Sequence, residues 1–135
     1  MKLTVADTYF YLAILNIRDT AHRLAIDTSD RLPGQIVTTD LVLVEVADAM
    51  CSSHHRSKFL DLLDLIEADG RTQVIRSNEQ LFRVGVELYR QRSDKDSPLT
   101  DCISFVVMRQ QGLNEALTAD HHFEQAGFVA LLMPG

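Results

Sequence analysis

The sequence predicts an α/β fold, a three-layer α/β/α sandwich whose central sheet has five parallel strands. Short apolar runs alternate with segments of helical periodicity along the chain, as in a parallel sheet with crossover helices on both faces. The 135 residues, of which 46% are apolar and 24% charged, suffice for a full hydrophobic core. We therefore expect residues 1–135 to form a single domain.

The N-terminal elements are expected to be a strand at residues 3–6 and a helix through the apolar positions of residues 9–14. Asp19 is expected to cap a second helix, and Pro33 with Gly34 to form the turn that follows it. The residues of this second helix that we expect to face the core are Ala21, Leu24 and Ala25.

The middle of the chain is expected to add a strand at residues 35–38 and two helices. Thr39 or Asp40 can cap the first of these helices, and Gly70 can end the second. The second helix carries an apolar stripe at helical spacing. Its members are Phe59, Leu62, Leu63 and Ile66.

The C-terminal half is expected to hold the other three strands, at residues 72–76, 115–118 and 128–132. Ser77 with Gln80 has the spacing of a capping box and predicts the start of a helix. The remaining expected elements are a polar loop at residues 93–98, a helix at 99–111 that ends at Gly112, and a short helix capped by Asp120.

Composition excludes several classes of protein. The net charge of −6 argues against a non-specific nucleic-acid coat protein. Two cysteines are too few for a disulfide scaffold and indicate a reduced, cytoplasmic protein. The charge-free stretch at residues 8–17 is too short to span a bilayer, so we expect no membrane association.

Four acidic residues are expected at one edge of the sheet, where open parallel sheets bind their ligands. Asp7 directly follows the first strand, and Asp120 lies two residues past the fourth. Glu45 lies two turns into the helix after the second strand. Asp101 begins the helix that leads into the fourth strand, and such a helix starts at the same edge. For Asp120, helix capping alone is an alternative explanation.

The surroundings of these acids favour a bound cation. Asp7 and Glu45 stand among apolar residues with no lysine or arginine close in sequence. Four carboxylates at one edge repel each other unless a positive charge compensates them. Mg²⁺ and Mn²⁺ prefer carboxylate and water oxygens, and they can activate water. An acidic cleft of this kind suits phosphodiester hydrolysis.

Five segments together resemble the PIN-domain family. Within that family, the sequence looks most like the VapC-type toxins and their solitary relatives. Two of the segments are specific: Leu-Thr-Asp-Cys-Ile-Ser-Phe at residues 99–105 and Leu-Thr-Ala-Asp-His-His-Phe-Glu-Gln-Ala-Gly-Phe at residues 117–128. The others are residues 5–8, 15–19 with His22, and 39–45. The resemblance implies a five-stranded α/β/α sandwich and Mg²⁺- or Mn²⁺-dependent cleavage of single-stranded RNA or tRNA.

The resemblance also implies roles for individual residues. Asp7 and Asp101 would bind the metal directly, whereas Glu45 and Asp120 would bind it directly or through water and orient the attacking hydroxide. The residues whose hydroxyls would support these acids are Thr8 and Thr118. The sequence departs from the family at Ser97 and Pro98, where relatives often have an aromatic residue and then serine, which bears on substrate contacts more than on metal binding.

The sequence and the resemblance also lead to expectations about binding partners, the metal and an alternative function. Lys95, in the polar loop before Asp101, is the candidate for a substrate contact. The resemblance implies a small antitoxin protein gripped by a helical hairpin, and a homodimer. Zinc is disfavoured, because adjacent histidines on a helix point about 100° apart. The alternative function is a non-catalytic PIN-fold module that binds RNA or a protein partner.

Overall fold

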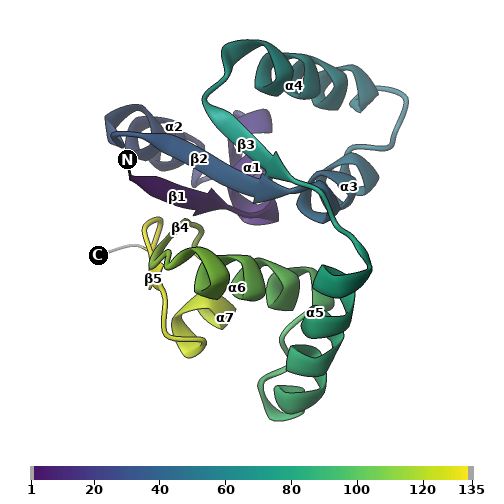
Figure 1. Cartoon of the computed structure of the whole chain (residues 1–135). Helices are drawn as coiled ribbons and strands as arrows, with labels where there is room; N and C mark the ends of the chain where they lie inside the picture. Colours follow the sequence, from purple (N-terminus) through teal and green to yellow (C-terminus); the bar gives the residue numbers. More distant parts are fainter. Residues whose placement is uncertain (1, 134–135) are drawn as a thin grey trace.

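Five parallel strands form the central sheet of the computed structural model, which describes residues 2–133 (Figure 1). In the order of the sheet these strands are β3 (Thr72–Ile75), β2 (Gln35–Thr39), β1 (Leu3–Ala6), β4 (Glu115–Leu117) and β5 (Val129–Ala130). Each neighbouring pair is parallel. The predicted number of strands and their direction are confirmed.

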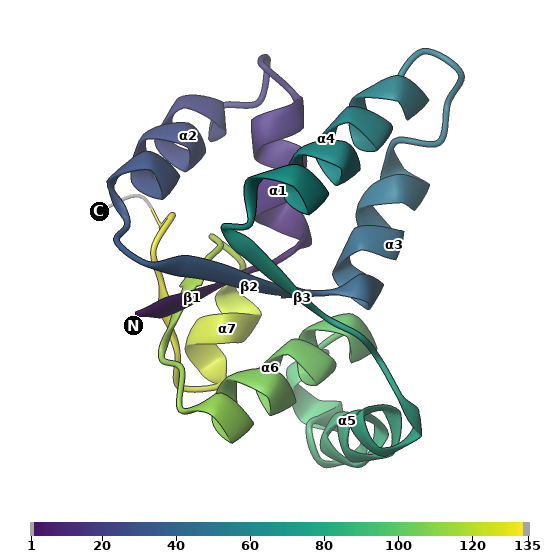
Figure 2. The same ribbon diagram turned by 45° about the horizontal axis from the view of Figure 1, so that its top comes forward.

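Helices cover both faces of the sheet, so the predicted three layers are also confirmed (Figure 2). One face carries α1 (Thr8–Leu15), α2 (His22–Arg31), α3 (Asp40–Ala49) and α4 (Arg56–Asp69). The other carries α5 (Glu79–Gln91), α6 (Leu99–Gln111) and α7 (His121–Gln125), and a 3₁₀ turn, η1 (Ser93–Lys95), precedes α6. Within residues 2–133, none of the helices combines the length and apolar character needed to cross a bilayer.

Apolar side chains form one cluster on each face of the sheet, because neighbouring strand residues point to opposite faces. In β1, Val5 belongs to the cluster under α5–α7 and Ala6 to the cluster under α1–α4. Helix α6 lies deepest: its residues 101–108 are all buried. Phe105 of α6 packs edge-on against Phe123, with ring centroids 4.9 Å apart. A side chain on α6 is therefore held in a rigid frame.

Two predictions about the start of α2 are wrong. The Asp19 carboxylate accepts a hydrogen bond from the Ala21 amide at 2.8 Å and closes a turn, whereas α2 begins only at His22 with no side-chain cap. Because the buried face of α2 follows Ala21, Ala25 and every fourth residue, Leu24 lies beside that face and is 41% exposed.

The predicted capping box at Ser77 is also wrong. Asn78 caps α5 instead, accepting a hydrogen bond from the Leu81 amide at 2.8 Å. The amide and hydroxyl of Ser77 donate to the Asp40 carboxylate, with its amide 3.0 Å from Oδ1. Ser77 therefore ties the end of β3 to the first turn of α3.

Candidate active site

The carboxyl ends of β1 and β4 and the N-terminal turns of α3 and α6 meet at one edge of the sheet (Figure 1). Asp7 lies between β1 and α1, and Asp120 follows β4. Asp101 lies in the first turn of α6, and Glu45 lies in the middle of α3. The crossover topology thus collects acids from both ends of the chain.

Asp7 is the most buried of the four acids, with 3% of its surface exposed. Its Oδ1 accepts from the Phe10 amide at 3.2 Å and so caps α1. Its Oδ2 accepts from the Thr118 hydroxyl at 2.7 Å. Burial raises the pKa of Asp7 from 3.8 to about 7; the hydrogen bonds from Thr118 and Phe10 oppose this rise, and the charge of Asp120 adds to it.

Asp101 is also buried, with 8% of its surface exposed. Its Oδ2 has no hydrogen-bond partner, although the atom is inaccessible to solvent. Burial raises the pKa of Asp101, and the negative charges of Asp120 and Asp7 raise it further. An unpartnered buried oxygen costs free energy, so this carboxylate has the surroundings of an incomplete binding site.

Asp120 is half-buried, and it both caps a helix and belongs to the acidic cluster, the two roles that the sequence left open. Its Oδ1 accepts from the His122 amide at 2.9 Å and caps α7. The Asp120 amide donates to the Thr118 hydroxyl at 2.9 Å, so Thr118 connects Asp120 to Asp7. Carboxylate oxygens of Asp7, Asp101 and Asp120 lie within 4.8 Å of one another. Helix capping and membership of the acidic cluster therefore coexist in one residue.

Glu45 lies beside this cluster of three rather than within it. Its Oε1 accepts a short hydrogen bond from the Thr8 hydroxyl, and Thr8 directly follows Asp7. Its charge contributes to the raised pKa of Asp101, which places both carboxylates on the same side of the molecule. Helix α3 has a solvent-facing side, where Val44 is 54% exposed, so Glu45 lies at the border of the core.

The donor set fits a hard divalent cation. Within residues 2–133, no lysine or arginine forms an ion pair with any of the four acids. Among the described residues, histidine is therefore the only side chain that could neutralise the three converging carboxylates, one of which has an unpartnered buried oxygen. Oxygen-only donors of this kind suit Mg²⁺ or Mn²⁺ better than Zn²⁺.

His122 was not among the site residues expected from the sequence. Its Nδ1 lies 2.6 Å from Asp120 Oδ1 and 3.8 Å from Asp101 Oδ2. The sequence feature that could have identified His122 is its position two residues after Asp120, in the first turn of the helix that Asp120 caps.

The remaining histidines also differ from expectation. The rings of His121 and His122 do not diverge but stack, with centroids 4.2 Å apart. Asp120, His121 and His122 also offer donor atoms within 4.8 Å of one another. Because His121 is mostly exposed and His122 Nδ1 contacts Asp120, the three carboxylates remain the better candidate. His22 is half-buried, and its Nδ1 lies 2.8 Å from the Ala13 carbonyl oxygen.

The segment before α6 holds the other predicted features. Lys95 is exposed in η1 and pairs with Asp94 at 3.8 Å. Ser97 is buried, and its hydroxyl lies 3.2 Å from Arg92 Nε. Pro98 precedes the first turn of α6, where its carbonyl accepts from the amide of Cys102, a fully buried residue. Within residues 2–133, the structure thus shows no ion pair between Lys95 and any of the four candidate acids.

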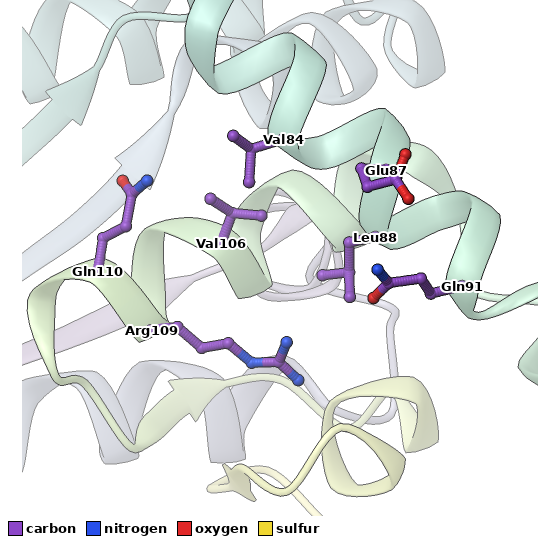
Figure 3. Close-up of a pocket in the computed structure, with 7 residues that line it drawn as sticks. All are labelled: Val84, Glu87, Leu88, Gln91, Val106, Arg109 and Gln110. Carbon is purple, nitrogen blue, oxygen red and sulfur yellow. The ribbon is translucent and has the colours of Figure 1, made fainter.

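A separate pocket of about 250 Å³ lies between α5 and α6 (Figure 3). Its apolar side is formed by Val84, Leu88 and Val106. Its polar rim consists of Glu87, Gln91, Arg109 and Gln110. None of the four acids lines this pocket, so it is distinct from the acidic cluster.

Comparison with known proteins gives the family and the fold. The PIN domain family matches residues 4–129. The structure of VapC20 from Mycobacterium tuberculosis has a TM-score of 0.86 at 23% sequence identity, over 95% of this chain and 97% of that one. VapBC2 from Rickettsia felis and FitAcB from Neisseria gonorrhoeae each have a TM-score of 0.68 over 96% of both chains, at 13% and 14% identity. No curated protein sequence matches the chain. Because the family match spans nearly the whole sequence, the chain belongs to the PIN domain family.

Proposed function

We propose that this protein is a divalent-metal-dependent endoribonuclease that hydrolyses phosphodiester bonds in single-stranded RNA or tRNA, and that it is the toxin of a type II toxin–antitoxin pair in the cytoplasm. The observation that carries the proposal is the convergence of Asp7, Asp101 and Asp120 within 4.8 Å, with an unpartnered buried oxygen on Asp101. Like charges brought this close destabilise a fold unless a cation compensates them. Membership of the PIN domain family supports a nuclease.

Each acid has a role in the proposed site. Asp7 and Asp101 would hold Mg²⁺ or Mn²⁺ directly, and Asp120 and Glu45 would hold it directly or through water and orient the attacking water. The bound ion would supply a Lewis acid that activates water and neutralises charge on the phosphate. The hydroxyls of Thr118 and Thr8 fix the rotamers of Asp7 and Glu45, because each donates a hydrogen bond to its carboxylate.

RNA is the proposed substrate because VapC20 is described as a toxin that cleaves the sarcin–ricin loop. Lys95 is the proposed phosphate contact, since it is exposed in the turn that leads into α6 and Asp101. Lys95 lies six residues before Asp101. An RNA strand bound at the acidic cluster would therefore pass the start of α6, where Lys95 could contact one of its phosphates.

The proposal is tested by incubating the protein with single-stranded RNA, tRNA and a sarcin–ricin loop hairpin in Mn²⁺, Mg²⁺ or EDTA. Wild type is expected to cut at least one of these RNAs with either metal and none in EDTA. Asp7→Asn is expected to be inactive, because it removes a metal-binding charge while the amide oxygen can still cap α1.

Two outcomes would contradict this proposal in different ways. Cleavage that persists in the Asp7→Asn protein would indicate a contaminating nuclease. A wild-type protein that binds RNA but neither Mn²⁺ nor Mg²⁺ would instead support the non-catalytic PIN-fold module.

An antitoxin is the proposed protein partner, and a homodimer the proposed form of the toxin. The solved structures from Rickettsia felis, Klebsiella pneumoniae and Salmonella typhimurium are described as toxin–antitoxin or VapBC assemblies. Between α3 and α4 the chain has an apolar groove of about 350 Å³. Its apolar lining consists of Leu43, Val44, Ala47, Phe59, Leu63, Ile66 and Val74. An amphipathic helix of the antitoxin would fit such a groove.

We expect Val44→Asp to prevent inhibition by the proposed antitoxin, because the exposed Val44 side chain lies in this groove. The RNase activity of the variant, measured alone, is expected to persist. Leu24→Asp, at an exposed position of α2, serves as the matched control and is expected to remain inhibited. Equal inhibition of wild type and Val44→Asp would rule out this groove as the antitoxin site.

A further inference from the structure

His122 is the one imidazole in the described chain that reaches two of the four acids. Its Nδ1 lies 2.6 Å from Asp120 Oδ1 and 3.8 Å from Asp101 Oδ2. The side chain is 15% exposed, compared with 64% for the neighbouring His121. His122 is therefore enclosed at the acidic cluster, whereas His121 is mostly exposed and approaches Asp120 alone, with its Nδ1 3.8 Å from Oδ1.

The short contact determines which ring nitrogen carries a proton. A carboxylate oxygen only accepts hydrogen bonds, so Nδ1 of His122 must be the donor to Asp120. The backbone amide of His122 donates to the same oxygen at 2.9 Å. Residue 122 thus supplies two donors to Oδ1 of Asp120, and Oδ2 stays available for another ligand.

Asp120 needs such a restraint because its neighbours repel it. The charges of Asp120, Asp7 and Asp101 act on one another, as the raised pKa values of Asp7 and Asp101 show. The imidazole adds a second donor to the one that the backbone amide of residue 122 supplies, and so opposes rotation of the Asp120 carboxylate away from this repulsion. The stacked ring of His121, with its centroid 4.2 Å away, limits rotation of the His122 imidazole.

We infer that His122 is a positioning residue of the metal site: it holds the Asp120 carboxylate so that Oδ2 is directed to an ion shared with Asp7 and Asp101. This inference rests on the proposed function, because it concerns the same site. Groups that hydrogen-bond to metal ligands fix their orientation, and replacing them costs about 10- to 100-fold in metal affinity or activity. We expect a loss of that size for His122→Ala.

The experiment measures Mn²⁺ binding by electron paramagnetic resonance, without RNA. Four proteins are compared: wild type, His122→Ala, His122→Asn and His54→Ala. His122→Ala is expected to bind Mn²⁺ about 10- to 100-fold more weakly than wild type. His122→Asn should restore most of the affinity, because its Nδ2 can donate from the place of the imidazole Nδ1. His54→Ala should bind as wild type does, since His54 is exposed in the turn before α4 and contacts none of the four acids in the described chain.

RNA cleavage at increasing Mn²⁺ provides the second measurement. His122→Ala is expected to need more Mn²⁺ for half-maximal rate while its KM for RNA stays unchanged, which a general loss of folding would not produce. Wild-type Mn²⁺ affinity in His122→Ala, or failure of asparagine to restore a lost affinity, would overturn the role of His122 alone. Absence of Mn²⁺ binding by wild type would overturn the proposed function itself, and with it this role.

Discussion

Asp101→Asn is expected to lower the rate of RNA cleavage by about 100-fold or more and, in metal-free buffer at pH 8, to make the fold more stable. Replacing a group that only supports a metal ligand costs about 10- to 100-fold, so replacing the ligand itself should cost at least the upper value. Stability should rise because the change removes a buried negative charge. The new amide is also able to donate to Asp120, where the carboxylate of Asp101 is repelled.

Thermal unfolding in EDTA, measured beside the cleavage assay, checks this prediction. Asp61→Asn, which removes a charge from an exposed position of α4, is the matched control and should change neither quantity appreciably. A clear loss of stability in Asp101→Asn without metal would show that the acid stabilises the fold, and would count against a cation site.

Without metal, the free energy of unfolding is expected to fall by about 3 kcal/mol between pH 4 and pH 7 because of Asp7 alone. The pKa of Asp7 is raised from 3.8 to about 7 in the fold, chiefly by burial. Between these values the folded chain keeps a proton that the unfolded chain has released, so stability decreases as pH rises. The contribution is fully present below pH 4 and lost above about pH 7. The raised pKa of Asp101 extends the loss in the same direction.

Denaturant unfolding at a series of pH values in EDTA measures this slope. Asp7→Asn is expected to flatten it, because the titrating group is gone, and saturating Mn²⁺ is expected to flatten it in wild type by stabilising the charged carboxylates. Since typical domains are stable by only 5–15 kcal/mol, the effect is large. A slope that is unchanged in Asp7→Asn would show that general charge repulsion, rather than this site, destabilises the protein at high pH.

Local patterns predicted most of the fold. Helix α6 begins at Leu99 and ends before Gly112 as expected, because the glycine adopts a left-handed backbone with φ of 68° there. The strands were correctly located, although β5 is limited to Val129–Ala130. These features depend on near neighbours in the chain, which a sequence displays directly.

Side-chain partners from distant segments were the part that local patterns missed. Ser77 has the spacing of a capping box, but its donors go to Asp40, which lies 37 residues earlier. The sequence shows His122 only as half of an adjacent histidine pair, since its approach to Asp101 depends on how α7 packs beside α6. The four acids were expected at one edge because strand topology alone brings them there, whereas the separation of Glu45 from the other three needed the structure.

Two of the acids have both a structural and a proposed catalytic role, which affects what their presence in a relative of this protein indicates. Asp7 and Asp120 each cap a helix as well as facing the cluster. A descendant that had lost catalysis would still gain stability from these caps, so selection for folding alone would retain a capping residue, aspartate or asparagine, at both positions. Asp101 has a buried oxygen with no hydrogen bond and no capping duty, and a chain that no longer cuts RNA would gain stability by losing it. Among relatives, the residue at position 101 should therefore distinguish nucleases from binding proteins better than the more visible acids at 7 and 120.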